Sequence, residues 1–244
     1  MNLKEDVISN VHKTIEESGY ENLYCEPLIG FVAANNSVFN DLSNILGHKH
    51  LLPTDILSNA ETIIVYFLPF SEKIAKLIQG EKTILQEWSD VYSITNILLI
   101  KISDNLKEMF NEQGIKVSGI PPTNNYNPVT LTSEWSHKSI AVMSGIGSFG
   151  LNRLLITKHG TCGRLNSIII DKYIESSKNS NHNYCLYYQT GKCKVCLERC
   201  PSGAISEHGI NKFRCNAYLD GKNIHDSQQG CPMCSSGPCA FKGF

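Results

Sequence analysis

The chain has 244 residues, 41% of them hydrophobic. That amounts to about 100 apolar side chains, enough for one or two domains with a real core, and it excludes a disordered chain. The formal net charge is −1, from 22 Lys and Arg against 23 Asp and Glu, so charge gives no reason to expect nucleic acid as a partner. No apolar run approaches the length of a membrane span, and the charged N-terminus lacks the apolar run of a secretory signal. We therefore expect no membrane contact and a cytoplasmic protein.

The first part of the chain predicts one helix and two strands. Leu3, Val7, Val11 and Ile15 recur at helical spacing, which predicts an amphipathic helix that ends at Gly19. Two short apolar runs, residues 28–33 and 62–68, predict buried strands. The polar segment between these runs has no clear period. It contains His48 and His50, which we expect to face solvent.

The middle of the chain predicts a long helix followed by short strands. Val91, Leu98 and Leu106 lie on one face of a helix that we place from about Ser89 to Gln113. Strands are predicted at residues 115–117, 154–157 and 168–170. Helices and strands do not alternate strictly, so the predicted fold class is α+β with a mixed sheet.

Composition divides the chain near residue 180. Residues 1–180 contain two of the ten cysteines, and residues 181–244 contain the other eight. The first part carries 15 basic and 19 acidic residues, and the second carries 7 and 4. A polar stretch without periodicity, residues 175–183, lies at the change and predicts a linker or surface loop. We therefore predict two domains, 1–180 and 181–244.

The eight clustered cysteines are the strongest chemical signal in the sequence. The tail has two halves of four cysteines each. The first half contains Cys185, Cys193, Cys196 and Cys200, and the second contains Cys215, Cys231, Cys234 and Cys239. In ferredoxin-type motifs, three thiolates bind one [4Fe–4S] cluster and the cysteine before a proline binds the other cluster. By this logic, Cys200, which precedes Pro201, crosses between the halves. The predicted ligand sets are Cys185, Cys193, Cys196 and Cys239 for one cluster, and Cys215, Cys231, Cys234 and Cys200 for the other.

Zinc and disulfides are the alternatives for this tail. Structural zinc favours paired C-x2-C knuckles, and neither half closes with a second such pair. Disulfides are rare in the reducing cytoplasm. Two [4Fe–4S] clusters with thiolate ligands would also offset the basic excess of the tail. Cys25 and Cys162 stand apart from the tail and are interpreted as apolar filler.

Three glycines, Gly145, Gly147 and Gly150, form a literal G-x-G-x-x-G, and Asp171 lies 21 residues beyond the last of them. The dinucleotide fingerprint needs a helix that opens within the glycines, whereas a strand is predicted directly after them. Two interpretations stay open. The glycines could let the backbone approach a flat or bulky ligand, or they could form a tight turn between a helix and a strand.

Several stretches together resemble the superfamily of epoxyqueuosine reductases and corrinoid reductive dehalogenases. These are the run from Trp135-Ser-His to Gly150-Leu-Asn152, then Leu155-Ile-Thr157, Gly160-Thr-Cys-Gly-Arg-Leu165 and the cysteine tail. The resemblance implies a nitroreductase-like domain that holds a cobalamin, followed by a ferredoxin-like module with two [4Fe–4S] clusters. It also implies that residues 136–153 border the corrin. The implied cofactor-binding residues are Ser136, His137, Gly145, Gly147, Gly150, Asn152 and Arg153.

The candidates for a catalytic proton donor are Tyr126, Glu134 and His137, chosen by side-chain type and by nearness to the glycines. The epoxyqueuosine branch of the superfamily has an aspartate donor upstream of the glycines. Here that position falls in Asn124-Asn-Tyr-Asn-Pro128, and no aspartate lies between Asp104 and Asp171. Arg164 joins Arg153 as a candidate to bind an anionic group of a substrate or cofactor.

Three function classes follow. The first is a cytoplasmic iron–sulfur oxidoreductase that takes electrons from a low-potential donor and passes them through two [4Fe–4S] clusters. The acceptors would be a corrinoid, or another flat cofactor, and a small-molecule substrate. The alternative is a ferredoxin-like electron-transfer protein that reduces a partner. The third is an epoxyqueuosine (tRNA) reductase, although the charge of the chain argues against nucleic acid. The oligomeric state stays open.

Overall fold

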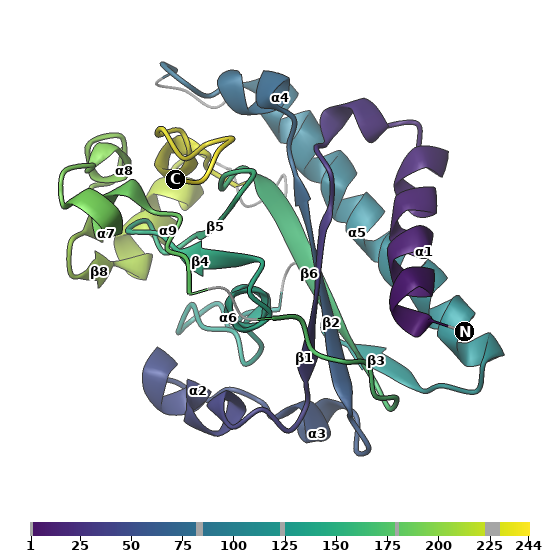
Figure 1. Ribbon diagram of the computed structural model, residues 1–244. Helices are drawn as coiled ribbons and strands as arrows, with labels where there is room; N and C mark the ends of the chain where they lie inside the picture. Colours follow the sequence, from purple (N-terminus) through teal and green to yellow (C-terminus); the bar gives the residue numbers. More distant parts are fainter. Residues whose placement is uncertain (1, 82–84, 123–124, 179–180, 223–229) are drawn as a thin grey trace.

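The computed structural model describes residues 2–81, 85–122, 125–178, 181–222 and 230–244. At its centre is a four-stranded sheet of β1 (Leu28–Ala33), β2 (Thr62–Pro69), β6 (Gly163–Ile170) and β3 (Val117–Gly119). The strand order is β1-β2-β6-β3, and all neighbours are antiparallel. Helices lie on both sides of this sheet (Figure 1). The predicted α+β fold class is confirmed, but the predicted mixed sheet is wrong, because the described strands of this sheet all pair antiparallel.

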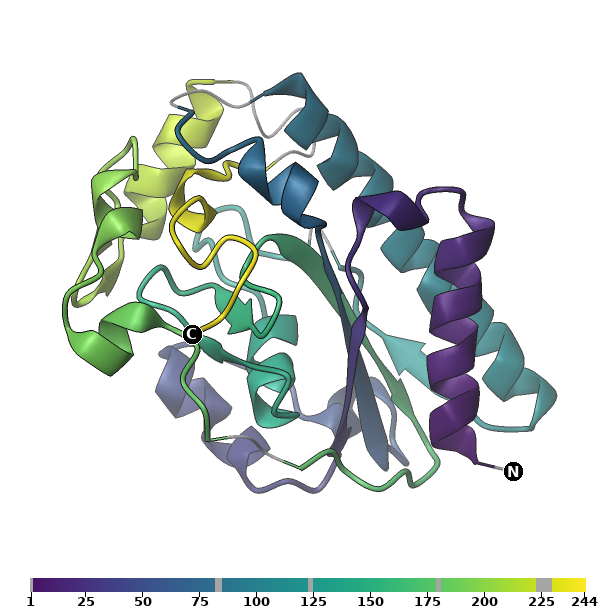
Figure 2. The ribbon, with the colours of Figure 1, turned by 45° about the horizontal axis from the view of Figure 1, so that its top comes forward.

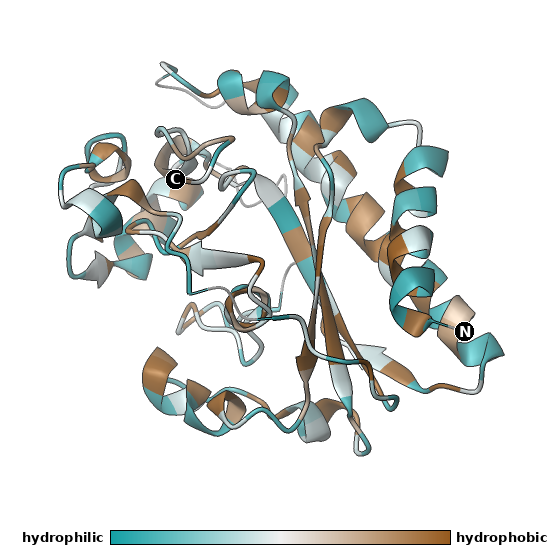
Figure 3. Cartoon of the chain, viewed as in Figure 1, coloured by the Kyte–Doolittle hydropathy of each residue, from teal (hydrophilic) through white to brown (hydrophobic). Residues whose placement is uncertain are grey.

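Strand β2 shows why the sheet lies at the core. All eight of its residues are buried. Ile64, Tyr66 and Leu68 pack in one apolar layer, and Ile63, Val65 and Phe67 pack in the other. Successive side chains of a strand point to opposite faces, so an unbroken apolar run suits a strand with a layer on each side. Figure 3 shows the same pattern as hydrophobic colour along the central strands.

Two long helices cover one face of the sheet. They are α1 (Leu3–Glu17) and α5 (Gln86–Glu112), and they pack side by side (Figure 2). The side chain of Asn2 caps α1 by accepting a hydrogen bond from the Lys4 N–H at 3.3 Å. Both helices lie where the hydrophobic periodicity predicts them. The short helices η1 (Glu21–Leu23) and α4 (Glu72–Lys76) flank this layer. No helix among the described residues is long and apolar enough to cross a membrane.

The opposite face is covered by α2 (Val38–Leu46), α3 (Pro53–Ile56) and α6 (His137–Met143). The segment that holds α2 and α3 shows no clear period in the sequence, so neither helix is predicted. Helix α2 buries only Phe39 and Leu42, and α3 has a single turn. Elements this short do not repeat an apolar face often enough to be recognised by spacing.

The third predicted strand is displaced in the structure. Residues 115–117 are expected to be extended, but the Ile115 N–H donates to the Phe110 carbonyl at 3.0 Å and so completes the end of α5. Gly114 has a φ of 73°, the left-handed conformation that commonly follows a helix. Strand β3 therefore starts only at Val117.

Two small hairpins and short helices complete the chain. Strands β4 (Gly147–Phe149) and β5 (Leu155–Thr157) form a hairpin directly after α6. The cysteine-rich region, residues 181–244, contains α7 (Leu186–Thr190), α8 (Val195–Glu198), β7 (Ile205–Ser206), β8 (Gly209–Ile210), α9 (Lys212–Asp220) and η2 (Met233–Ser235). Figure 1 shows this region next to the β4–β5 hairpin.

Hydrogen bonds hold both the polar stretch before residue 181 and the end of the chain against the large domain. In the polar stretch at 175–183, of which 179–180 lie outside the described residues, the Ser176 and Ser177 hydroxyls accept hydrogen bonds from the N–H groups of Ala33 and Phe31, each at 3.0 Å. The end of the chain then returns to the large domain. There the Cys162 N–H donates to the Ala240 carbonyl at 2.9 Å. The domain boundary at residue 180 stays a prediction that rests on composition.

Candidate functional site

The first group of cysteines surrounds a small cavity at the β4–β5 hairpin. Cys185, Cys193, Cys196 and Cys239 line it together with apolar side chains that include Leu151. Burial first, and then the thiols of Cys185, Cys196 and Cys193, raise the pKa of Cys239 to about 12. Burial and the thiols of Cys185 and Cys193 raise the pKa of Cys196 to about 11. These four thiols therefore lie close to one another.

The second group lies beside the first. Cys200 follows α8, Cys215 lies in α9, and Cys231 and Cys234 lie in the last segment of the chain. Burial raises the pKa of Cys231 to about 11, and the thiols of Cys215 and Cys200 add to the effect. The pKa of Cys234 is raised by burial and then by the Cys231, Cys215 and Cys200 thiols, with Cys196 of the first group also contributing. The thiols of this group influence one another's pKa values, and the assignment of two sets of four ligands stays a prediction from the spacing.

Cys200 has a different environment from its neighbours. Burial raises the pKa of its thiol. Hydrogen bonds from the Ser202 side chain and from the backbone of Ser202, Ala204 and Ile205 lower the pKa by more than burial raises it, so the net pKa is lowered. Several donors that point at one sulfur stabilise the thiolate. This is the chemistry that a metal-bound cysteine needs.

The number of thiols in each group can be compared with the ligand number of a [4Fe–4S] cluster. Among the residues that the structure describes, no three His, Cys, Asp or Glu side chains converge as ligands of one metal ion. Each group nevertheless offers four thiols, the ligand number of a [4Fe–4S] cluster. Metal binding replaces the thiol protons, so the raised pKa values describe the metal-free chain. The residues present fit two such clusters.

His137 lies inside a chain of buried polar groups. The Trp135 indole N–H donates to the Ser167 hydroxyl at 3.0 Å, and that hydroxyl lies 2.8 Å from Nδ1 of His137. On its other side, Nε2 of His137 lies 3.3 Å from the Pro121 carbonyl oxygen. The Asn125 side-chain nitrogen, which only donates, lies 3.4 Å from the same Nε2, so this ring nitrogen faces both a donor and an acceptor. Burial lowers the pKa of His137 to about 4, and the imidazole is neutral near pH 7.

The other two candidate proton donors are exposed, whereas His137 is buried. The Glu134 carboxylate is exposed and forms an ion pair with the Lys49 ammonium at 3.3 Å. Tyr126 lies in the loop before α6 and is 41% exposed. Among the described residues, no hydrogen bond joins Tyr126 or Glu134 to His137. Part of the loop in which an aspartate is missing, Asn124, lies outside the described residues.

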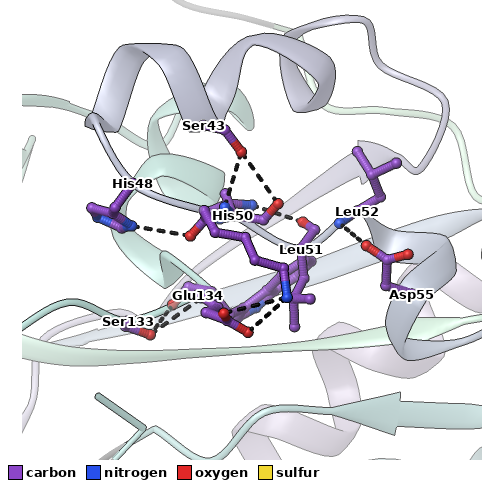
Figure 4. A network of polar contacts seen from close by, with 10 residues as sticks. Ser43, His48, His50, Leu51, Leu52, Asp55, Ser133 and Glu134 are labelled. Carbon is purple, nitrogen blue, oxygen red and sulfur yellow. Dashed lines mark hydrogen bonds and ion pairs between the residues drawn. The ribbon is translucent and has the colours of Figure 1, made fainter. Parts of the chain in front are cut away.

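His50 is a structural residue that the sequence does not reveal. It is expected to face solvent, but it is buried and its ring lies 5.3 Å from the Trp135 ring. Nε2 of His50 accepts a hydrogen bond from the Ser136 N–H at 3.0 Å, and Nδ1 lies 2.7 Å from the Leu51 carbonyl oxygen. Figure 4 shows the surrounding network, in which the Ser43 hydroxyl contacts the backbone of His50. His50 thus fixes the start of α6.

Ser136 and the glycines shape the backbone around α6. The Ser136 hydroxyl accepts a hydrogen bond from the Ser139 N–H at 3.2 Å and so caps the helix. Gly145 has a φ of 78° just after the helix. A Cβ on Gly147 would lie 2.6 Å from the Ile156 carbonyl oxygen, and one on Gly150 would lie 2.6 Å from Oδ1 of Asn152. The space beside Gly147 and Gly150 is filled by the hairpin itself, which favours the turn over a ligand cradle.

Asn152 and Arg153 contact the cysteine-rich region. The Asn152 side-chain amide donates to the Cys234 carbonyl at 2.8 Å. Nη2 of Arg153 donates to the His208 carbonyl at 3.4 Å. Both residues, predicted to bind a cofactor, therefore bind the chain's own backbone in this structure.

Lys138 lies near both Cys234 and a second cation, Arg164. Burial lowers the pKa of Lys138, the Cys234 thiol opposes this shift, and Arg164 adds to it. The Lys138 ammonium donates to the Arg153 carbonyl at 3.3 Å. The Arg164 guanidinium donates to Asn96 at 2.9 Å and stacks on the Tyr92 ring. No ion pair within the described part of the chain includes either cation. Lys138 has one sequence signal: it is the sole Lys, Arg, Asp or Glu between Glu134 and Arg153.

The fold belongs to a class that solved structures of reductases share. No family model matches the chain. The structure of epoxyqueuosine reductase from Streptococcus thermophilus aligns with a TM-score of 0.60 and 21% sequence identity, over 98% of this chain and 66% of that one. The Bacillus subtilis enzyme aligns with a TM-score of 0.57 at 20% identity, over 98% and 67% of the two chains.

More distant relatives agree with this assignment of the fold. A catabolic reductive dehalogenase aligns with a TM-score of 0.56 at 13% identity, over 78% of this chain and 27% of that one. In sequence, epoxyqueuosine reductase of Yersinia pestis is 28% identical over 97 residues, which are 39% of this chain and 22% of that protein. The chain spans about two thirds of the solved epoxyqueuosine reductases. The structural resemblance to epoxyqueuosine reductases and reductive dehalogenases, expected from the motifs, is confirmed across nearly the whole chain.

Proposed function

We propose that the chain is a cytoplasmic iron–sulfur reductase with two [4Fe–4S] clusters. The observation that carries this proposal is the cavity lined by Cys185, Cys193, Cys196 and Cys239, in a fold shared with solved reductase structures. Such clusters accept and pass on single electrons at low potential. Electrons from a low-potential donor would cross the first and second groups and reach an acceptor in residues 1–180.

The position of the second group supports its role as the exit for electrons. The Cys234 thiol influences Lys138 on α6, and Cys234 is hydrogen-bonded through its carbonyl to Asn152 of the hairpin. The positive charges of Lys138 and Arg164 would stabilise a reduced, more negative acceptor or an anionic substrate on this side of the large domain. Neutral His137 would donate a hydrogen bond rather than an acidic proton.

A corrinoid is the acceptor that the fold relatives suggest, and Gly147 and Gly150 do not fit it. A Cβ built on either glycine would lie 2.6 Å from an atom of the same hairpin, so these two glycines do not form an open cradle for a flat ring. We therefore derive no step through a corrinoid. The filled segment favours a second candidate function, an electron-transfer protein that reduces a partner without an organic cofactor.

A tRNA substrate is the third candidate. One solved relative is an epoxyqueuosine reductase in complex with a modified tRNA stem loop, and it aligns with a TM-score of 0.58 at 19% identity. The net charge of −1 offers little electrostatic attraction for a phosphate backbone. A salt-dependent shift of a tRNA stem loop in a binding assay would favour this candidate.

The test is a visible absorption spectrum of the anaerobically purified chain, recorded before and after reduction with dithionite. A second sample is incubated with hydroxocobalamin and desalted. A broad iron–sulfur absorption that bleaches on reduction supports the proposal, and retained corrin bands would identify the acceptor. Bleaching without retained corrin supports the partner-reducing protein. A spectrum without iron–sulfur absorption contradicts both.

A further inference from the structure

The turn between β4 and β5 links the two thiol groups through Asn152. This residue is 3% exposed. Its Nδ2 donates to the Cys234 carbonyl oxygen at 2.8 Å, and its Oδ1 accepts from the Leu154 N–H at 3.1 Å. Asn152 also lines the cavity of the first group, Cys185, Cys193, Cys196 and Cys239. One side chain thus touches the surroundings of both groups.

The turn holds Asn152 firmly. The Arg153 N–H donates to the Gly150 carbonyl at 2.9 Å, and the Gly150 N–H donates to the Leu154 carbonyl at 2.9 Å. Arg153 has a φ of 60°, a conformation that is unfavourable for residues other than glycine. The Lys138 ammonium binds the Arg153 carbonyl from the side of α6. The side chain of Asn152 therefore meets Cys234 from a fixed position.

The loop of Cys234 is also ordered by local contacts. The Ser235 N–H donates to the Pro232 carbonyl at 2.8 Å, and the Ser235 hydroxyl donates to the same oxygen at 2.7 Å. These contacts shape the η2 turn, but they lie within it. Asn152 attaches the turn to the large domain through the carbonyl of Cys234 itself. The N–H dipole of the Asn152 side-chain amide points its positive end at the Cys234 carbonyl.

We propose that Asn152 is a positioning residue for the second thiol group. Its amide fixes the Cys234 loop and raises the reduction potential of the cluster held by Cys200, Cys215, Cys231 and Cys234. This inference rests on the proposed function, because it requires the clusters. The amide donates to the Cys234 carbonyl and not to the sulfur, so its effect on the cluster is electrostatic: a positive dipole end nearby favours the reduced form, which carries one more negative charge.

Two variants of the full chain test this role. Asn152→Ala removes the donor. Asn152→Asp keeps the size of the side chain and the acceptor for the Leu154 N–H, but a carboxylate cannot donate to the Cys234 carbonyl. We therefore expect the potential of the second cluster to shift to a lower value in both variants, because the positive end of the amide dipole is lost. The fall should be larger for Asn152→Asp, which adds negative charge.

The readout is a redox titration of the anaerobic chain followed by electron paramagnetic resonance. Cys196→Ser and Cys231→Ser assign the two signals to the first and second groups. Asn183→Ala is the matched control, because Oδ1 of Asn183 accepts from the Cys185 N–H at 2.9 Å and so acts on the first group. It should move the first potential and leave the second. Asn44→Ala, exposed on α2, should move neither.

The result that supports the proposal is a lowered second potential with iron content and first potential unchanged. The proposal is overturned if both Asn152 variants keep the second potential, if both clusters shift equally, or if both variants simply lose iron. An unaltered chain that contains no iron overturns the proposed function as well. The iron content of the unaltered chain therefore separates the two failures.

Discussion

The buried polar groups around α6 are held by partners from distant parts of the chain. His137 bonds to Ser167 of β6, and the Ser136 N–H is bound by His50, 86 residues earlier. The identity of His137 as a notable residue is visible in the sequence, but its state is not. Its low pKa results from burial under segments that no local pattern reveals. The same reason explains why His50 is buried against Trp135 although its neighbours are polar.

His137 gives a prediction for the dependence of stability on pH. Its folded pKa of about 4 lies below the ordinary value of 6.5. The unfolded chain therefore binds more protons between these values, and stability falls as the pH falls from 6.5 toward 4. When the pH falls from 7 to 5.5, the titration of His137 should lower the free energy of unfolding by about 1 kcal/mol. Thermal unfolding at both pH values should show a smaller loss for His137→Gln, and an equal loss in the two proteins would contradict the assignment.

At the scale of elements, period and length decide what the sequence reveals. The long helix α5 and the unbroken apolar strand β2 repeat their patterns often enough to be recognised. Helices α2 and α3 do not, and β3 is displaced because Ile115 closes the end of α5. The glycines after α6 predict either a ligand or a turn. The close approach of Gly147 to strand β5 favours the turn over the ligand. That approach exists only in the folded hairpin, so the sequence alone does not reveal it.

The hairpin gives a prediction for stability. Gly147→Ala places a Cβ 2.6 Å from the Ile156 carbonyl oxygen, and a backbone atom in a paired strand cannot move away cheaply. We expect a loss of about 1–3 kcal/mol, the usual cost of overpacking, measured as a lower thermal midpoint. Gly237→Ala is the control, since its Cβ would make an ordinary 3.5 Å contact with Val195. An unchanged midpoint for Gly147→Ala would show that the hairpin has room for a ligand.

At the scale of the whole molecule, cysteine spacing predicts more than any other feature. Ferredoxin logic predicts that Cys200 and Cys239 each join a group from the other half of the tail, and the pKa values of Cys234 and Cys239 respond to thiols of those groups. The sequence does not show how the region attaches to the large domain. That attachment depends on particular contacts, such as those of Asn152 with Cys234 and of Cys162 with Ala240. They join residues more than 70 positions apart.

Single cysteine variants test the grouping. Cys196→Ser should lose one cluster and keep about half of the iron, because the four thiols of the second group stay intact. Cys25→Ser is the control, since Cys25 lies outside both groups and its thiol contacts the Phe70 carbonyl. It should keep all the iron. Full iron in Cys196→Ser would refute the ligand assignment, and the assay is colorimetric iron per chain.

The most direct measurement is the content of iron and acid-labile sulfide in the anaerobically purified, unaltered chain. Two four-iron clusters predict about eight of each per chain. One or two zinc ions without sulfide, or four fully oxidised cysteine pairs, would contradict the account, because either would leave the eight thiols without an electron-transfer role.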